Sequence, residues 1–128
     1  ERLTWIEDHY PTFTRLVERG VWMQLTAASV AGKFGRRPRY WSHRMLDEGC
    51  VHILASDAHH PERRPTILSE GRDAAALRVG EIEANHLVLT RPQGIVENAA
   101  PGDLPPLPHG KMLPKAGGGF WKRLIGAQ

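Results

Sequence analysis

The spacing of apolar residues along the chain predicts helices that alternate with two short strands. Continuous apolar runs over 21–26 and 50–56 indicate strands covered on both faces, as the strands of parallel sheets are. Apolar residues at helical spacing predict the other elements, which are helices over 10–19, 39–48, 66–79, 81–89 and 92–98. This alternation is typical of an α/β fold with parallel strands.

Turn-forming residues mark the ends of these predicted elements. Pro11 suits the first turn of the first helix, and Gly20 is placed to end that helix. Residues 28–38 contain two glycines and a proline, and they are predicted to form a loop. The helix over 39–48 is expected to bury three side chains, those of Trp41, Met45 and Leu46.

The composition changes at Ala99, where a segment rich in proline and glycine begins. Residues 99–128 carry too few apolar residues to pack, so we expect a disordered tail after a domain of residues 1–98. Residues 1–98 hold 13 basic and 13 acidic side chains, so the net charge of +3 belongs to the tail. This balance argues against a nucleic-acid-binding domain. The tail includes GFWKRLIG at 119–126, which could dock on the domain or contact an anionic membrane.

The length of 128 residues corresponds to one domain, and the chain begins with Glu1 and Arg2. Two strands are too few for a closed barrel or a doubly wound sheet, so we expect part of a larger α/β domain. The single cysteine, Cys50, excludes an intramolecular disulfide framework and a zinc site built from cysteines. No apolar run approaches the ~20 residues of a membrane span and no signal-peptide pattern is present, which predicts a cytoplasmic protein.

Candidate chemistry is concentrated in the polar segment SDAHHPERRP at 56–65, directly after the second predicted strand. Asp57 and His59 are two residues apart, which places both side chains on one side of an extended segment. A carboxylate and an imidazole suit Mn²⁺, iron or Zn²⁺, and Arg64 could bind an oxyanion such as phosphate. The alternative is structural, because loop aspartates often cap turns and two ligands fall short of the roughly four to six that these metals take.

Other signals argue against competing chemistries. Ser56 stands six residues after Cys50, where cysteine phosphatases have an arginine, so Cys50 is predicted to be a buried strand residue. Neither GxxxxGK[ST] nor GxGxxG is present, which leaves nucleotide binding without support. His52 lies within the second predicted strand and is expected to be a core residue with satisfied hydrogen bonds.

Three strings resemble one enzyme family, in this order along the chain: QLTAASVAGKFG at 24–35, HILASDAHHPERRP at 52–65 and GEIEANHLVLTRPQGIVEN at 80–98. Through them, residues 1–98 are similar to the PHP-superfamily protein-tyrosine phosphatases of bacterial capsule and exopolysaccharide loci. The opening Glu-Arg matches the end of that family's His-Pro-Glu-Arg motif. The resemblance implies the C-terminal part of a distorted (β/α)₇ barrel. The family's N-terminal half, with its His-x-His pair and a metal-binding glutamate, would lie outside this chain.

The resemblance also implies roles for individual residues. Asp57 and His59 would be ligands of a metal cluster that is often manganese, with iron, zinc or magnesium as alternatives. Arg2 and Arg64 would hold the phosphate of a phosphotyrosine protein, expected to be a bacterial tyrosine kinase of polysaccharide synthesis and export. His60 stands where the family often has asparagine and receives no role. Because too few ligands remain, this piece alone is expected to be nearly inactive.

Two alternative functions stay open at this point. One keeps the fold but changes the substrate to a small phosphoester such as histidinol phosphate, and the string QLTAASVAGKFG argues against it. The other is a non-catalytic module that binds acidic partners or a membrane through the basic tail.

Overall fold

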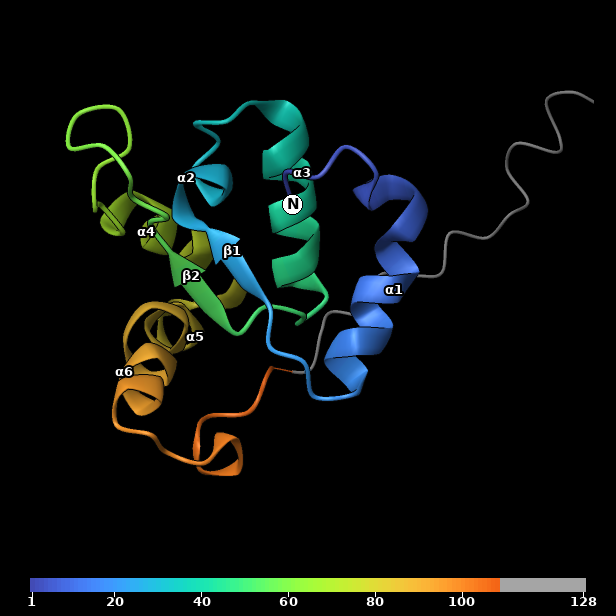
Figure 1. The fold of residues 1–128 in the computed structure, drawn as a ribbon, viewed down its shortest axis with the longest axis vertical. Helices are drawn as coiled ribbons and strands as arrows, with labels where there is room; N and C mark the ends of the chain where they lie inside the picture. The colour runs from blue at the N-terminus through green and yellow to red at the C-terminus, as the bar shows by residue number, and fades with distance from the viewer. Residues whose placement is uncertain (109–128) are drawn as a thin grey trace, which may run out of the picture.

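The computed structural model describes residues 1–108, which form helices around two short strands (Figure 1). The strands are β1 (Gln24–Thr26) and β2 (Ile53–Ala55). The helical elements are α1 (Ile6–Glu18), α2 (Ala27–Val30), α3 (Arg36–Asp47), α4 (Ser69–Val79), α5 (Glu81–Asn85), the π-helical turn η1 (His86–Thr90), α6 (Arg91–Val96) and the 3₁₀ turn η2 (Pro101–Asp103). None of the helices in residues 1–108 has the length and hydropathy that a membrane span needs. The segment 119–126 lies outside the described residues, so its membrane contact stays a prediction.

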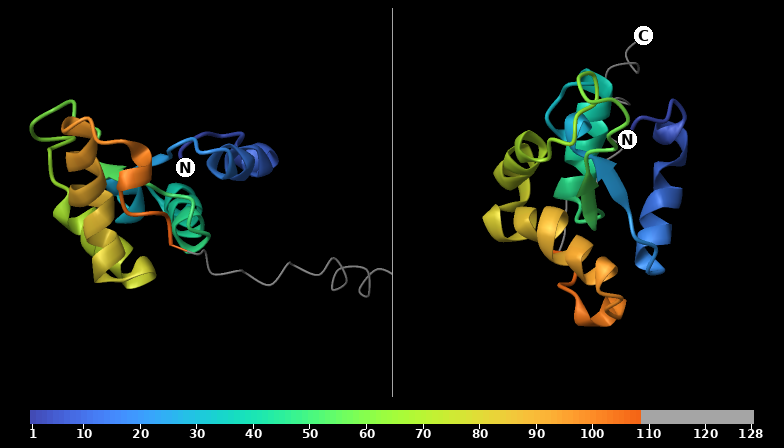
Figure 2. Two further views of the ribbon diagram at one scale, coloured as in Figure 1. Left: turned by 90° about the horizontal axis from the view of Figure 1, so that it is seen from below. Right: turned by 60° about the vertical axis from the view of Figure 1, so that its left-hand side comes forward.

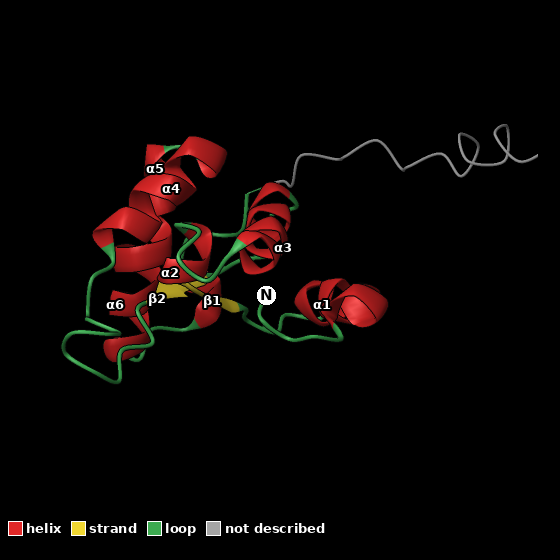
Figure 3. Cartoon of the chain, turned by 90° about the horizontal axis from the view of Figure 1, so that it is seen from above, coloured by secondary structure: helices red, strands yellow, loops and turns green. Residues whose placement is uncertain are grey.

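The strands β1 and β2 pair in parallel, which confirms the predicted α/β alternation. The register runs Gln24↔Ile53, Leu25↔Leu54 and Thr26↔Ala55. Helices α1 and α3 lie on one side of the strands and α4, α5 and α6 on the other, with α1 outermost (Figures 2 and 3). The strands are therefore covered by helices, as their continuous apolar runs predicted.

The hydrophobic core lies around the two strands. Leu25 and Leu54, each 2% exposed, are its members from the strands. The three residues of α3 that the sequence predicts to face inward are all buried there. The core cluster comprises Ile6, Tyr10, Leu25, Val30, Trp41, Met45, Leu46, Val51, Leu54, Ala75 and Leu87.

Helix α1 begins at Ile6, earlier than the predicted start at residue 10, so Pro11 lies inside the helix and not in its first turn. The buried residues of α1 are Ile6 and Tyr10, which precede the proline. The Tyr10 ring packs on Trp41 of α3 at a centroid distance of 5.1 Å. Burial of this earlier turn against α3 extends the helix ahead of the proline, a tertiary effect that local spacing does not reveal. Gly20, with φ of 87°, lies just beyond the C-terminal end of α1, as predicted.

The predicted loop over 28–38 is wrong at both ends, because α2 occupies Ala27–Val30 and α3 begins at Arg36. The third predicted helix begins at Ser69, three residues late. Its Gly71 lets α4 approach α2, because glycine has no side chain. A Cβ atom at Gly71 would lie 2.5 Å from Cβ of Ala27. The last two predicted helices run together as α5, η1 and α6.

The expectation of a disordered tail from Ala99 is wrong for residues 99–108. Gly94 of α6 leaves room for Leu104, whose side chain would clash with a Cβ at that glycine. The guanidinium of Arg91 donates to the carbonyl oxygens of Pro105 at 2.9 Å and Pro106 at 2.8 Å. The proline-rich segment is ordered because its carbonyl groups satisfy a buried cation. Residues 109–128 lie outside the described part of the chain.

The Arg91 side chain is fully buried and also forms an ion pair with Glu83. Its two terminal nitrogens donate to the Glu83 carboxylate at 2.7 and 3.1 Å, and one of them also donates to the carbonyl of His52 at 3.3 Å. Burying a charge is costly unless such partners surround it. The Arg91 network therefore ties α5, α6, the chain ahead of β2 and the segment after η2 into one unit.

The variant Arg91→Met tests this network. The substitution leaves the Glu83 carboxylate buried without its cation, so we expect the free energy of unfolding to fall by about 3–5 kcal/mol. Chemical denaturation measures this change. The matched control is Arg72→Met, which removes ion pairs to the more exposed Asp73 and Glu81 and should leave the free energy of unfolding nearly unchanged. Equal losses in the two variants would contradict the assigned role of Arg91.

His52 is buried at 7% exposure, as the sequence predicts. Its Nδ1 accepts a hydrogen bond from the backbone N–H of Met23 at 3.1 Å, and its ring stacks on Trp22 at 4.9 Å between centroids. Burial, and then the nearby charge of Arg91, lower the pKa of His52 from 6.5 to about 4, although Glu83 acts in the opposite direction. The imidazole is therefore neutral in the folded protein at pH 6, and it stabilises the fold in that form.

A histidine titration followed by NMR tests this environment. The folded-state pKa lies below the unfolded value, so the stabilisation is present above pH 6.5 and is lost as the pH falls towards about 4. We expect the His52 ring signals of the folded protein to stay unchanged from pH 7 to pH 5. The same signals should titrate near 6.5 in urea. A folded-state midpoint near 6.5 would refute the assignment.

Candidate functional site

Asp57 begins the functional segment two residues after the end of β2. Its backbone has a φ of 52°, the left-handed region that aspartate tolerates better than most residues with a Cβ. The segment is thus turned at Asp57, and the extended geometry that the sequence predicts is wrong at this residue. The two side chains meet nevertheless, with 3.8 Å between Oδ1 of Asp57 and Nδ1 of His59.

Arg64 connects the two predicted ligands. One terminal nitrogen of its guanidinium donates to Oδ2 of Asp57 at 2.6 Å, and the other donates to Nε2 of His59 at 2.7 Å. The loop returns to this position through a backbone hydrogen bond from Arg64 N–H to the His60 carbonyl at 3.0 Å. The Nδ1 of His60 accepts from the N–H groups of Glu62 and Arg63, both at 3.2 Å. His60 therefore shapes the turn, a role that its sequence position did not indicate.

Arg2 reaches the same group from the start of the chain. One of its guanidinium nitrogens lies 3.8 Å from Oδ2 of Asp57. Its neighbour Glu1 accepts a hydrogen bond from the Ser29 hydroxyl at 2.8 Å and a longer one, 3.4 Å, from the N–H of Thr26. Glu1 thus attaches the start of the chain to β1 and α2. All four residues singled out from the sequence consequently lie together, beside the carboxyl ends of the paired strands.

Phe34 is a further member of this group that the sequence reasoning missed. The centre of its ring lies 4.6 Å from the guanidinium carbon of Arg2 and 5.5 Å from that of Arg64. Its position in a predicted loop gave no sign of these contacts. The available signal was the pair of glycines around it, Gly32 and Gly35, which allow a backbone turn that other residues rarely adopt.

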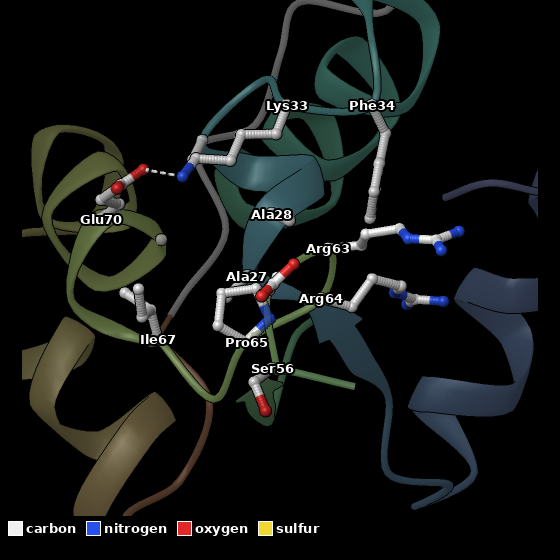
Figure 4. A pocket seen from close by; sticks show the side chains of 13 residues that line it. Ala27, Ala28, Lys33, Phe34, Ser56, Arg63, Arg64, Pro65, Ile67 and Glu70 are labelled. Carbon is white, nitrogen blue, oxygen red and sulfur yellow. Dashed lines mark ion pairs between the residues drawn. The ribbon is translucent and has the colours of Figure 1, made fainter. Parts of the chain in front are cut away.

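A cavity of about 270 Å³ adjoins the group and shares Arg64 and Phe34 with it. Figure 4 shows Lys33 and Glu70, paired at 2.6 Å, at one end of this cavity and Phe34 with Arg64 at the other. Its floor includes small apolar groups of Ala27 and Ala28. Arg64 therefore belongs both to the charged group and to the lining of a cavity with apolar and charged side chains.

The charged groups of the site are open to solvent. The side chains of Asp57 and Arg64 are 40% and 23% exposed. Ion pairs at such exposure contribute only about 0–1 kcal/mol to stability. These ion pairs therefore add little to the stability of the fold. Two guanidinium groups around one carboxylate and one imidazole are better explained by binding of a charged ligand.

The donor chemistry of Asp57 and His59 fits a divalent metal ion. Carboxylate oxygen and imidazole nitrogen suit manganese, iron and zinc. Two ligands at the usual distances from one ion are at most about 4.4 Å apart, and the two atoms facing each other here are separated by 3.8 Å. The pair already faces a cation, the Arg64 guanidinium. Within residues 1–108 no group of three or more such ligands gathers, so a metal site that included this pair would need further ligands.

Cys50 is placed away from this chemistry. It is half-buried, lies outside the three residues of β2 and is a free thiol. The prediction of a strand residue is therefore wrong, because the ladder begins only at Ile53. Burial raises the pKa of the Cys50 thiol, and the carboxylates of Glu48 and Glu18 raise it further. Such a thiol is a poor nucleophile at neutral pH, in agreement with the missing cysteine-phosphatase signature.

A carboxylate, an imidazole and two guanidinium groups beside the carboxyl ends of parallel strands form the kind of site that holds a cation next to an oxyanion. Comparison with known sequences makes the assignment specific. The chain belongs to the capsular polysaccharide synthesis CpsB/CapC family, whose sequence profile matches residues 1–97. The resemblance to the tyrosine phosphatases of capsule loci is thereby confirmed.

Individual relatives are also named as tyrosine-protein phosphatases. Tyrosine-protein phosphatase YwqE of Bacillus subtilis is 36% identical over 64 residues, which are 50% of this chain and 25% of YwqE. Tyrosine-protein phosphatase CpsB of Streptococcus pneumoniae is 26% identical over 101 residues, which are 75% of this chain and 42% of CpsB. One chain from the crystal structures of YwqE and CpsB, described as unique metal-dependent tyrosine phosphatases, matches with a TM-score of 0.70 at 25% identity. The match covers 82% of this chain and 41% of that one, so the chain spans less than half the length of these relatives.

Proposed function

We propose that this chain supplies part of the active site of a metal-dependent protein-tyrosine phosphatase. Asp57 and His59 belong to the metal-binding set, and Arg2 and Arg64 bind the phosphate of the substrate. The observation that carries the proposal is the position of Arg64, which donates to both proposed ligands at 2.6 and 2.7 Å. A phosphate held by that guanidinium would lie next to the metal-binding residues.

The two arginines are suited to the charge that develops during phosphoryl transfer. A guanidinium presents its N–H donors in a planar fork that matches the oxygens of a phosphate. Arg2 and Arg64 approach Asp57 from different parts of the chain, so they can contact different phosphoryl oxygens. Fixed donors of this kind stabilise the transition state without having to reorganise. When bound, a divalent ion supplies Lewis-acid catalysis and lowers the pKa of a water molecule.

The finer features of the proposal come from the family resemblance. The metal is manganese, and the two described strands belong to a distorted (β/α)₇ barrel whose other strands lie outside residues 1–108. The substrate is a phosphotyrosine protein of the capsule or exopolysaccharide locus, namely a tyrosine kinase, and the enzyme acts in the cytoplasm. The names of YwqE and CpsB as tyrosine-protein phosphatases support the substrate class. The 128-residue piece is inactive on its own, since residues 1–108 gather no complete ligand set.

The variant Asp57→Ala in the full-length, manganese-loaded protein tests the proposal. Loss of even an outer partner of a metal site commonly lowers activity about 10–100-fold, so loss of a ligand should cost at least about a hundredfold. Turnover of a phosphotyrosine peptide measures the effect, and a chelator should abolish the wild-type activity until manganese is restored. The matched control, Asp73→Ala, removes an exposed carboxylate paired with Arg72 and should change nothing.

The same assay decides between substrate classes. The proposal predicts a higher kcat/KM for the phosphotyrosine peptide than for histidinol phosphate. The reverse preference would favour the phosphoesterase of small molecules. Activity that survives chelation, or that is unaffected in Asp57→Ala, would contradict the metal-dependent mechanism altogether. Manganese-dependent turnover by residues 1–128 alone would show that this piece holds a complete site.

A further inference from the structure

The loop that carries Phe34 has a defined conformation. Helix α2 ends in a Schellman motif, in which Gly32 N–H donates to Ser29 O at 3.0 Å and Lys33 N–H donates to Ala28 O at 2.9 Å. Gly32 has a φ of 82°, as this motif requires. Phe34 comes directly after Lys33 and before Gly35. Gly35 has a φ of 93° and leads the chain into α3. The ring is therefore presented from a short turn with left-handed glycines on both sides.

Phe34 lies against both guanidinium groups of the site. The guanidinium carbons of Arg2 and Arg64 lie 4.6 and 5.5 Å from the ring centre, within the range of cation–π attraction. Two like charges near one another repel, so something must hold the two arginines close together. The Asp57 carboxylate contributes, at 3.8 Å from Arg2 and 2.6 Å from Arg64. This carboxylate also faces His59, and in the proposed function it binds the metal ion as well. It is therefore shared between the two arginines and other partners.

We propose that Phe34 is a positioning residue that holds the guanidinium groups of Arg2 and Arg64 close enough together to bind one phosphate group. This inference rests on the proposed function, because it assigns Phe34 to the same site. The aromatic ring is not a metal ligand, so its contacts with the two arginines do not depend on whether Asp57 takes part in metal binding. In this role Phe34 acts on the phosphate only through the two guanidinium groups that its ring contacts.

Two other roles for Phe34 make different predictions. A ring that only packs would be replaced well by leucine, which keeps the apolar character and loses the negative face of the aromatic system. A ring that contacts the tyrosyl ring of the substrate would affect the peptide but not free phosphate. Binding of inorganic phosphate therefore separates positioning of the arginines from both alternatives.

The experiment compares Phe34→Leu, Phe34→Tyr and Phe13→Leu in the full-length protein. The control residue Phe13 is also partly buried and stacked on an aromatic ring, that of Trp5 at 5.9 Å, but it belongs to α1. Inorganic phosphate is titrated into the metal-free protein, with the guanidinium signals of Arg2 and Arg64 followed by NMR. Turnover of a phosphotyrosine peptide by the manganese-loaded protein is measured in parallel, and thermal unfolding shows whether each variant is folded.

We expect Phe34→Leu to weaken phosphate binding about three- to tenfold and to lower kcat/KM by a similar factor, with an unchanged melting temperature. Phe34→Tyr should restore both quantities, because the aromatic face is retained, and Phe13→Leu should alter neither. Unchanged phosphate affinity in Phe34→Leu would overturn the inference, and so would a wild-type protein that binds no phosphate. A wild-type protein that binds phosphate but does not hydrolyse the peptide would refute the proposed function, while the phosphate affinities would still decide the role of Phe34.

Discussion

The parallel pairing of β1 with β2 is the constraint on which the site depends. Because the register aligns Thr26 with Ala55, both strands end at the same edge of the sheet. Helix α2, which holds Glu1 through Ser29, starts directly after β1, and the turn at Asp57 starts two residues after β2. Segments that are far apart in the chain thus supply Arg2, Phe34, Asp57 and Arg64 to one place. A different register would separate the carboxylate from the first arginine.

Charged residues have two separate roles in this structure. The Arg91–Glu83 pair is buried and joins α5, α6 and the chain through Pro106, so it supports the fold. The pairs around Asp57 are open to solvent, where electrostatic attraction contributes little to stability. In the proposed function, these pairs arrange charge for a ligand. The fold therefore depends on the buried pair and not on the exposed cluster around Asp57.

Much of the fold and part of the candidate site could be predicted from the sequence. The predictions that were wrong have physical causes. The strands, the buried face of α3 and the core position of His52 follow from local apolar spacing. The position of Asp57 beside the strand ends follows from its place after a buried strand, whereas the return of Arg64 to Asp57 depends on the turn at His60. The early start of α1 depends on packing against Trp41, and the order of residues 99–108 depends on the Arg91 guanidinium. The contacts of Phe34 likewise arise only when three distant segments come together.

The central claim is that one site joins metal ligands from this chain to two phosphate-binding arginines. The most direct test is a crystal structure of the full-length protein with manganese and inorganic phosphate, in which anomalous scattering at the manganese edge locates the metal. The account predicts manganese bonded to Asp57 and His59, with phosphate oxygens accepting hydrogen bonds from Arg2 and Arg64. Manganese bound without these two ligands, or phosphate bound away from both arginines, would contradict it.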